Sequence, residues 1–223
     1  MAVTVATIIN NAKVILQETG AEGIRWTNDE LCEWLNEFYQ SAVGLKPDVS
    51  TVNTDLALAA GTKQLVPLDA LRLIDVVRNT NGRAVRVMTR HALDNMRRGW
   101  HSDPESTEIE CFVFDDMDPQ TFYVYPPAAM GASLEIIYST VPESHDVSAG
   151  FAVYSLEAFK LQDAYAPCAT DYILYRAFSK DAETGANLNR AQVHYSAFMQ
   201  QLTGKSATDN GTSPNAPDLS ANA

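Results

Sequence analysis

The spacing of apolar residues first predicts two helices at the N-terminal end of the chain. Apolar positions recur at helical spacing over residues 3–19, and Gly20 offers a C-terminal stop. A second amphipathic stretch follows Thr27, which forms a capping-box pattern with Glu30, and it should end near Gly44. Polar residues occupy the opposite face of each stretch. Both segments are therefore expected to be helices that face a core.

The pattern changes to short runs of branched and aromatic residues between about residues 55 and 141. Turn signals such as Asn79–Gly82 separate these runs, which predicts short strands. The connections are too short for parallel crossovers, so we expect a mostly antiparallel sheet of about five strands with one short helix. The clearest hairpin is Phe114–Pro127, where an acidic Asp-Pro turn joins two aromatic strands and Pro126-Pro127 should end the second.

The C-terminal third returns to helical spacing. Helices are expected at about 167–179 and 188–202, with Gly204 as the end of the last one. Beyond Gly204 the chain is rich in Ser, Thr, Asn, Asp and Pro, and Leu219 is its only apolar residue apart from alanines. Such a segment cannot bury enough surface to fold alone. We expect it to be an extended tail that docks on neighbouring subunits.

These patterns together predict an α+β fold. A helical bundle built from the N- and C-terminal helices should carry an inserted antiparallel β-domain and an extended C-terminal tail. The expected boundaries are 1–54 for the N-terminal helices, 55–142 for the β-domain, 143–203 for the C-terminal helices and 204–223 for the tail.

Composition narrows the classes of partner. The net charge of -12 argues against binding nucleic acid or an anionic membrane through a basic surface. We find neither a signal-peptide pattern nor a run of about 20 apolar residues that could span a membrane, which favours a cytoplasmic origin. The cysteines Cys32, Cys111 and Cys168 lack metal-ligand spacing and are expected to be reduced, mostly buried thiols.

One segment is locally basic. Thr89 can cap a short helix that ends at Gly99, and this helix and its flanks carry Arg86, Arg90, Arg97 and Arg98 beside His91, Trp100 and His101. One interpretation is a site for RNA or another anion. The favoured interpretation is a solvated helix face whose arginines pair with carboxylates.

An acidic turn carries Asp115, Asp116 and Asp118. A Ca²⁺ site is one hypothesis, but the segment lacks the glycine and distal glutamate of an EF-hand, so turn chemistry is favoured. The chain also lacks a dinucleotide-binding glycine motif, a P-loop, a nucleophile elbow and a zinc-binding histidine pair. No catalytic, cofactor-binding or metal residue is therefore assigned, and an enzyme is disfavoured.

Several phrases, in order over about residues 5 to 203, together resemble head-to-tail adaptor (connector) proteins of tailed, chiefly short-tailed, bacteriophages. They are Arg25-Trp26-Thr27 with Glu30-Leu31 and Trp34-Leu35-Asn36; Leu58 to Gln64 with Leu65 and Pro67; Val77-Arg78-Asn79; Asp118-Pro119 through Pro127; and Tyr172 to Asp181 with Ala191 and His194 to Phe198.

The resemblance implies a structural virion protein rather than an enzyme. Such proteins form a ring, here expected to be a dodecamer, that joins the portal to the tail nozzle or tube and lines the DNA exit channel. DNA would pass without specific binding, and tail fibres are a further candidate partner. The expected location is the head-tail interface of a virion assembled in the host cytoplasm, with no cofactor and no membrane involved.

Candidate partner-interface residues are Lys205, Thr212, Pro214, Pro217 and Leu219 in the tail, and Arg97, Arg98, Trp100, Tyr123 and Tyr125 in the β-domain. Two alternatives stay open. The first is a tail-associated glycan- or fibre-binding module that uses the aromatic residues of the β-insertion. The second is a metal-dependent enzyme that uses the three aspartates of the acidic turn.

Overall fold

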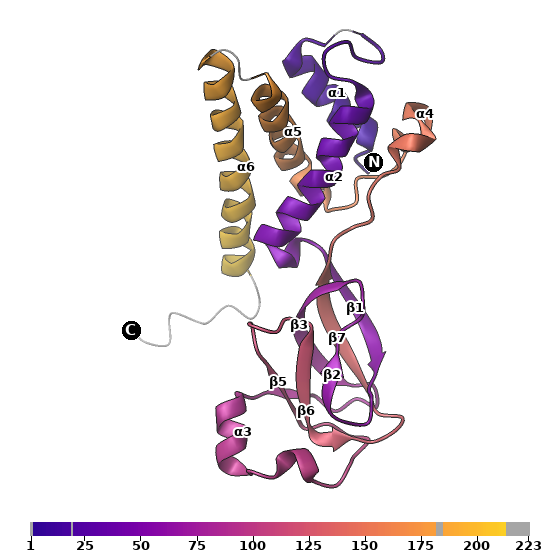
Figure 1. The fold of residues 1–223 in the computed structure, drawn as a ribbon, viewed down its shortest axis with the longest axis vertical. Helices are drawn as coiled ribbons and strands as arrows, with labels where there is room; N and C mark the ends of the chain where they lie inside the picture. The colour runs from indigo at the N-terminus through magenta and orange to yellow at the C-terminus, as the bar shows by residue number, and fades with distance from the viewer. Residues whose placement is uncertain (1, 19, 182–184, 213–223) are drawn as a thin grey trace. The chain divides into compact units, whose positions relative to one another are not determined.

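The computed structural model describes residues 2–18, 20–181 and 185–212, with side chains through Gly204 (Figure 1). The chain forms two compact units, Met1–Lys46 with Pro142–Ala223 and Pro47–Val141. The first holds helices from both ends of the chain, and the second holds the strands. The predicted α+β class is confirmed.

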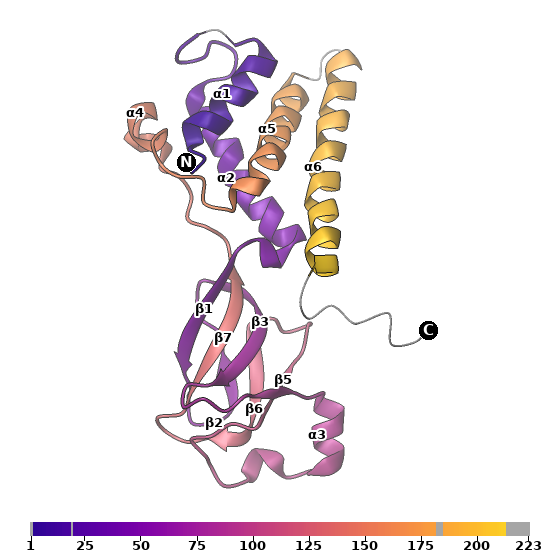
Figure 2. The same cartoon turned by 180° about the vertical axis from the view of Figure 1, so that it is seen from behind.

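The described part of the helical unit contains four long helices and one short one. They are α1 (Val5–Leu16), α2 (Asn28–Leu45), α4 (Phe151–Tyr154), α5 (Ala166–Lys180) and α6 (Gly185–Thr212), with 3₁₀ turns at Val147–Ala149 and Asp163–Tyr165. Helix α5 packs against α1, α2 and α6 and so lies in the middle of the unit (Figures 1 and 2). The buried core of the helical unit includes Ile8, Leu35, Phe38, Ile173 and Phe198.

Side-chain caps explain where the N-terminal helices start. The Thr27 hydroxyl accepts a hydrogen bond from the Glu30 backbone N–H at 3.3 Å, as predicted. The reciprocal bond of a capping box is absent, because the Glu30 carboxylate instead accepts from Lys180 Nζ at 2.7 Å. The stop predicted at Gly20 is wrong. Helix α1 ends at Leu16, and Gln17 itself takes the left-handed cap conformation with φ 56°.

The predicted end of the last helix is also wrong. Helix α6 continues through Gly204 to Thr212, so the backbone of this stretch is not extended. A single glycine destabilises a helix by only about 1 kcal/mol, and no proline lies between Gly204 and Pro214 to end the helix. Lys205 and Thr212 therefore lie on α6, whereas the predicted contact residues Pro214, Pro217 and Leu219 lie outside the described residues.

The β unit contains two sheets rather than the single sheet expected. In the first, β7 (Ser133–Thr140) lies between β1 (Thr51–Ala57) and β3 (Ala70–Asn79). The second has the order β2 (Gly61–Leu65), β6 (Thr121–Ala128), β5 (Cys111–Phe114) and β4 (Arg86–Val87). A 3₁₀ turn at Pro47–Val49 precedes β1, which begins ahead of the strand expected from Asp55.

One strand pair departs from the antiparallel expectation. Strands β4 and β5 are parallel. The segment between them holds α3 (Arg90–Met96) and a 3₁₀ turn at Trp100–Ser102, and it is long enough for the crossover that a parallel pair needs. Thr89 caps α3 as predicted, since its hydroxyl accepts from the Ala92 N–H at 3.3 Å.

The hairpin of β5 and β6 is confirmed, with Phe114 opposite Phe122. Its second strand does not stop at the prolines but continues to Ala128. The proline positions are tolerated because β2 pairs irregularly with this part of β6. In addition, the Pro127 carbonyl accepts from the Ser106 N–H at 2.8 Å, so this end of β6 still pairs with the chain through its acceptor group.

The two sheets share one hydrophobic core, which includes Leu73, Val76, Phe122, Val124, Leu134 and Ile136. Residues from both sheets contribute to it, so the β unit has a core of its own. None of the helices in the described part of the chain combines the length and the apolarity needed to cross a membrane.

Candidate functional site

The aromatic residues proposed as a binding face form a small core. Trp100 is only 1% exposed and packs with Leu93 and Val113, and its ring meets Tyr123 and Tyr125 edge-on at centroid distances of 6.3 and 6.5 Å. The Trp100 indole N–H donates to Asp94 at 2.8 Å. Trp100 therefore stabilises the β unit and offers no exposed ring to a glycan, while the two tyrosines are half-buried.

Two of the four arginines in this segment pair with carboxylates, which confirms the favoured interpretation in part. Arg97 Nε lies 2.5 Å from Asp103 Oδ2, and Arg90 Nε lies 3.7 Å from Asp94 Oδ2. Arg98 is exposed. The Arg90–Asp94 pair is exposed on both sides and contributes little stability, because water screens it, whereas the Asp103 carboxylate that pairs with Arg97 is mostly buried. The two pairs do neutralise much of the local positive charge.

The acidic turn is organised by its own backbone. Asp115 Oδ1 accepts from the Met117 N–H at 3.0 Å, and the Asp115 carbonyl accepts from the Asp118 N–H at 3.0 Å. Asp116 pairs with Arg72 at 2.5 Å. A shallow hollow of about 320 Å³ lies beside the turn. The turn-chemistry prediction is confirmed, and the described residues contain no group of three or more His, Cys, Asp or Glu arranged to hold a metal ion.

The three cysteines are free and buried, as predicted. Burial raises the pKa of Cys32 and of Cys168 to about 12, and it also raises the pKa of Cys111. Thiolates would therefore be scarce at neutral pH, and these side chains act as small apolar residues of the core.

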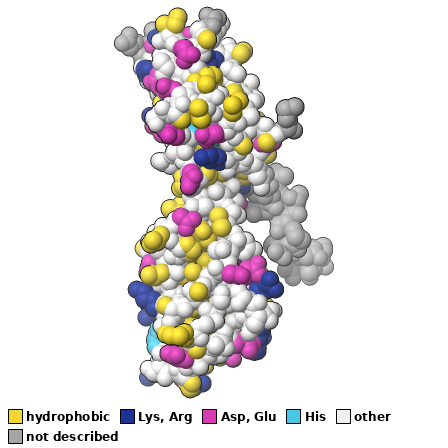
Figure 3. All heavy atoms as spheres, turned by 90° about the vertical axis from the view of Figure 1, so that its right-hand side faces the viewer, with side chains coloured by type: hydrophobic (Ala, Val, Ile, Leu, Met, Phe, Trp, Pro, Cys, Tyr) yellow, Lys and Arg dark blue, Asp and Glu magenta, His cyan; other side chains and the backbone are white. Residues whose placement is uncertain are grey.

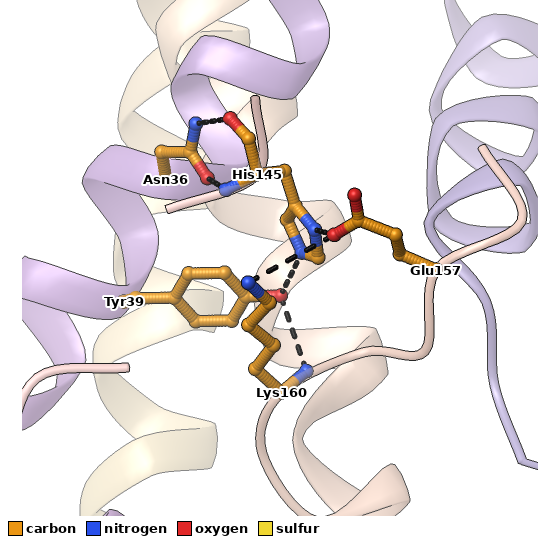
Figure 4. A network of polar contacts seen from close by, with 5 residues as sticks. All are labelled: Asn36, Tyr39, His145, Glu157 and Lys160. Atoms are coloured by element: carbon orange, nitrogen blue, oxygen red, sulfur yellow. Dashed lines mark hydrogen bonds and ion pairs between the residues drawn. The ribbon is translucent and has the colours of Figure 1, made fainter. Parts of the chain in front are cut away.

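A buried polar cluster involves the segment that leads back from the β unit into the helical unit (Figure 4). Asn36 on α2 binds the backbone of His145 twice: its Nδ2 donates to the His145 carbonyl at 3.0 Å, and its Oδ1 accepts from the His145 N–H at 2.8 Å. The His145 side chain is fully buried. This pairing replaces water at the buried backbone N–H and carbonyl of His145 and holds the segment against α2.

The His145 ring is held at both nitrogens. Its Nδ1 lies 2.5 Å from Glu157 Oε2, and its Nε2 lies 2.9 Å from the Tyr39 hydroxyl. A carboxylate can only accept, so Nδ1 carries the proton and Nε2 accepts from Tyr39. The Tyr39 oxygen in turn accepts from the Lys160 N–H at 3.3 Å. The network thus connects α2, the returning segment and the stretch before α5.

Electrostatics favour the neutral form of this histidine. Burial lowers the pKa of His145, and the neighbouring Lys160 charge acts in the same direction, while the bond to Glu157 opposes them. Burial also raises the pKa of the Tyr39 hydroxyl, which keeps its proton. The cluster therefore has a structural role at neutral pH, as an anchor for the returning segment.

Sequence reasoning missed this cluster. The sequence around His145 does not reveal its role, because the partners of this residue lie 12 to 109 residues away along the chain. One local signal did exist: Asn36 sits between Leu35 and Phe38 on the apolar side of α2, and all three are buried. A buried amide of that kind requires partners, so it indicates a packed segment.

A match to a known protein family spans both units of the chain. Residues 3–218 match the family model described as SU10 adaptor protein. No curated protein sequence matches the chain.

Proposed function

The chain belongs to the SU10 adaptor protein family, and from this membership we propose that it is a structural adaptor at the head-tail junction of a bacteriophage virion. The match over residues 3–218 carries the proposal, because it includes the helical unit, the β unit and the end of α6. The role is one of assembly, so the relevant features are surfaces that bind other chains rather than a catalytic centre.

We propose further that the protein forms a closed ring of twelve copies between the portal and the tail nozzle or tube. DNA would pass through the ring. The net charge of -12 supports this role, because a wall with excess carboxylates repels phosphates and does not retain DNA. Arg90 and Arg97 are paired with carboxylates, which agrees with a surface that does not retain nucleic acid.

The C-terminal end is proposed to grip the portal or a neighbouring copy. The sequence after Thr212 has a single apolar residue apart from alanines, Leu219, together with Pro214 and Pro217. Such a segment gains order mainly by lying along another chain. Lys205 and Thr212, on the last turns of α6, would then lie where that contact begins.

Co-expression with the portal protein of the same phage tests this proposal. The full chain should bind the portal as a ring that electron microscopy can count, and it should be monomeric without the portal. Failure of the full chain to bind either portal or tail protein would overturn the proposed function.

Two truncations then test the grip. Removal of residues 213–223 should weaken portal binding while the helical content stays unchanged. Removal of residues 205–223 should weaken it at least as much. Unchanged portal binding by both truncated chains would contradict the proposed grip and leave the adaptor role standing.

A further inference from the structure

A hollow of about 430 Å³ lies in the helical unit beside the end of α1 and the start of α6. Its apolar lining comes from Ile15 and Leu16 at the end of α1, Trp26 before α2 and Phe178 near the end of α5. Leu16, Trp26 and Phe178 are buried, whereas Ile15 is 50% exposed. The lining therefore includes an aliphatic surface that another side chain can cover.

Two arginines line the same hollow, which we call the arginine hollow. Arg25 pairs with Asp181, whose carboxylate also accepts from Asn187 Nδ2 at 2.8 Å. Arg190 lies over the Phe178 ring, 5.6 Å from its centre, and among the described residues no carboxylate pairs with it. A guanidinium has five N–H donors, so Arg190 and the remaining donors of Arg25 can bind a further carboxylate.

An indole N–H in this lining also lacks a partner. The Trp26 Nε1 group is buried, and within the described part of the chain no atom accepts a hydrogen bond from it. The Arg25 guanidinium lies over the same ring, 5.1 Å from its centre. Buried donors are paired with protein or with ordered water in the great majority of cases. An acceptor from another chain would supply the missing partner.

The positive charge of the arginine hollow is local. Over the described atoms of the face in Figure 3, Lys and Arg side chains are scattered among Asp and Glu side chains. The whole chain has 28 Asp and Glu against 16 Lys and Arg. A polyanion such as DNA needs a broad basic surface. Two arginines in one hollow fit a ligand that brings a single carboxylate instead.

The segment after Thr212 has the matching chemistry. Residues 213–223 hold one charged residue, Asp218, and one apolar residue apart from alanines, Leu219. Because the two are adjacent, one short stretch of chain presents a carboxylate beside an aliphatic side chain. Pro217 directly precedes them and restricts the backbone, which lowers the entropy lost on docking.

This segment cannot reach the arginine hollow of its own copy. Arg190 and Thr212 lie 22 positions apart on α6, which is about 33 Å at the rise of an α-helix (Figures 1 and 2). Asp218 lies six positions beyond Thr212, a stretch that spans at most about 21 Å when fully extended. Helical side chains also lean toward the N-terminal end of their helix, away from Thr212. A segment that fills the hollow must therefore come from another copy.

We propose that Asp218 and Leu219 of one copy dock in the arginine hollow of the next copy. Asp218 then pairs with Arg190 and Arg25, and Leu219 covers Ile15. This inference rests on the proposed adaptor function and names the site that receives the C-terminal grip. Contact between two different patches repeats from copy to copy and closes into a ring when the rotation allows. A tethered segment has an effective concentration of about millimolar order, so a weak contact suffices within a ring.

Cross-linking through introduced cysteines tests this contact. The native thiols are buried, so a short bismaleimide should react with Ile15→Cys and Ser220→Cys, which leave Asp218 and Leu219 in place. In rings formed on the portal, the chain with both cysteines should give a ladder of linked chains up to the full ring. A mixture of the two single variants should give dimers only, and either single variant should give no linked dimer.

The same reagent tests the reach of the segment. Without the portal, the chain with both cysteines should show no internal link, because its own hollow is too distant. Rings without links in this chain, dimers from one single variant, or an internal link in the monomer would each overturn the inference.

Removal of the charges gives a second test in the chain with both cysteines. Asp218→Asn should lower the rate of linking by about tenfold, because a charge-assisted contact is lost, and Arg190→Gln should also lower it. The chain with both changes should link at the rate of Asp218→Asn alone, since both changes remove one contact. Arg176→Gln is the control, because this arginine already pairs with Glu37. Unchanged rates in Asp218→Asn, or additive losses, would contradict the proposed pairing.

Two further outcomes separate the inference from the function. Links from position 220 to a portal chain, identified by mass spectrometry, would refute the arginine hollow as the receiving site and leave the adaptor role intact. Failure of the wild-type chain to bind portal or tail protein would overturn both.

Discussion

Asn36 and His145 are 109 residues apart in sequence and are joined by two hydrogen bonds between the Asn36 side-chain amide and the backbone N–H and carbonyl of His145. One planar side-chain amide thus satisfies both the backbone N–H and the backbone carbonyl of the same residue, and we call this pair of bonds the clip. It fixes the place where the chain rejoins the helical unit after the β unit.

Removal of this amide should release the returning segment. Asn36→Ala leaves the N–H and the carbonyl of His145 without partners, and each unsatisfied buried group costs about 1–3 kcal/mol. Thermal unfolding of the helical unit should shift to lower temperature, and amide hydrogen exchange over residues 143–150 should accelerate. Gln40→Ala, on the exposed side of the same helix, is the control and should change neither. Unchanged exchange in Asn36→Ala would show that the clip does not hold the segment.

The stability of the helical unit should depend on the protonation of His145. Its pKa in the folded state is lowered from the ordinary 6.5, so the folded state favours the neutral ring. That contribution is present above the unfolded pKa and is lost as pH falls through the folded pKa. Protonation would also place an N–H on Nε2, which now accepts from Tyr39.

Melting curves recorded from about pH 7 down to about pH 5 measure this effect. The wild-type chain should lose more stability over that interval than His145→Gln, which has no titrating ring. Equal losses in the two chains would mean that other groups carry the acid sensitivity.

Gly23 should not tolerate a side chain. Its φ of +83° is unfavourable for any L-residue, and an added Cβ would lie 2.1 Å from the Trp26 carbonyl oxygen. Gly23→Ala is therefore expected to destabilise the helical unit by more than about 1 kcal/mol. Gly44→Ala in α2 is a matched control with no atom within 4 Å of the added group, and it should stabilise the helix by about 0.5–1 kcal/mol. Urea unfolding distinguishes the two signs.

Trp100 should behave as a core residue. Trp100→Ala removes a side chain that is 1% exposed and should destabilise the β unit by about 3–5 kcal/mol. Trp100→Phe keeps much of the packing but loses the bond to Asp94, so its effect should be smaller. Near-ultraviolet circular dichroism during urea unfolding follows this loss. A fully stable Trp100→Ala chain would reopen the glycan-binding alternative.

Local chemistry predicted the helices and the hairpin well. These features depend on neighbours within a few residues, which the sequence itself shows. They are the caps at Thr27 and Thr89, the turn at Asn79–Gly82 and the strands around Asp115–Asp118. The end of α6 was missed because glycine is only a weak helix breaker, and packing or a long hydrogen-bond ladder can override it.

Non-local features could not be predicted in the same way. The division into two sheets depends on which strands meet across long loops, and the parallel β4–β5 pair depends on a crossover made largely of α3. The buried state of Trp100 and the partners of His145 are likewise set by tertiary contacts.

The pairing of β1 with β7 has a practical consequence for engineering. Thr51 lies opposite Ser139, so the chain enters and leaves the β unit through adjacent strands. A few residues could then bridge the gap if the whole insert were excised, and the insert could be grafted into another host through the same two joints. The β unit is thus a self-contained module that could be exchanged while the sequence of the helices stays unchanged.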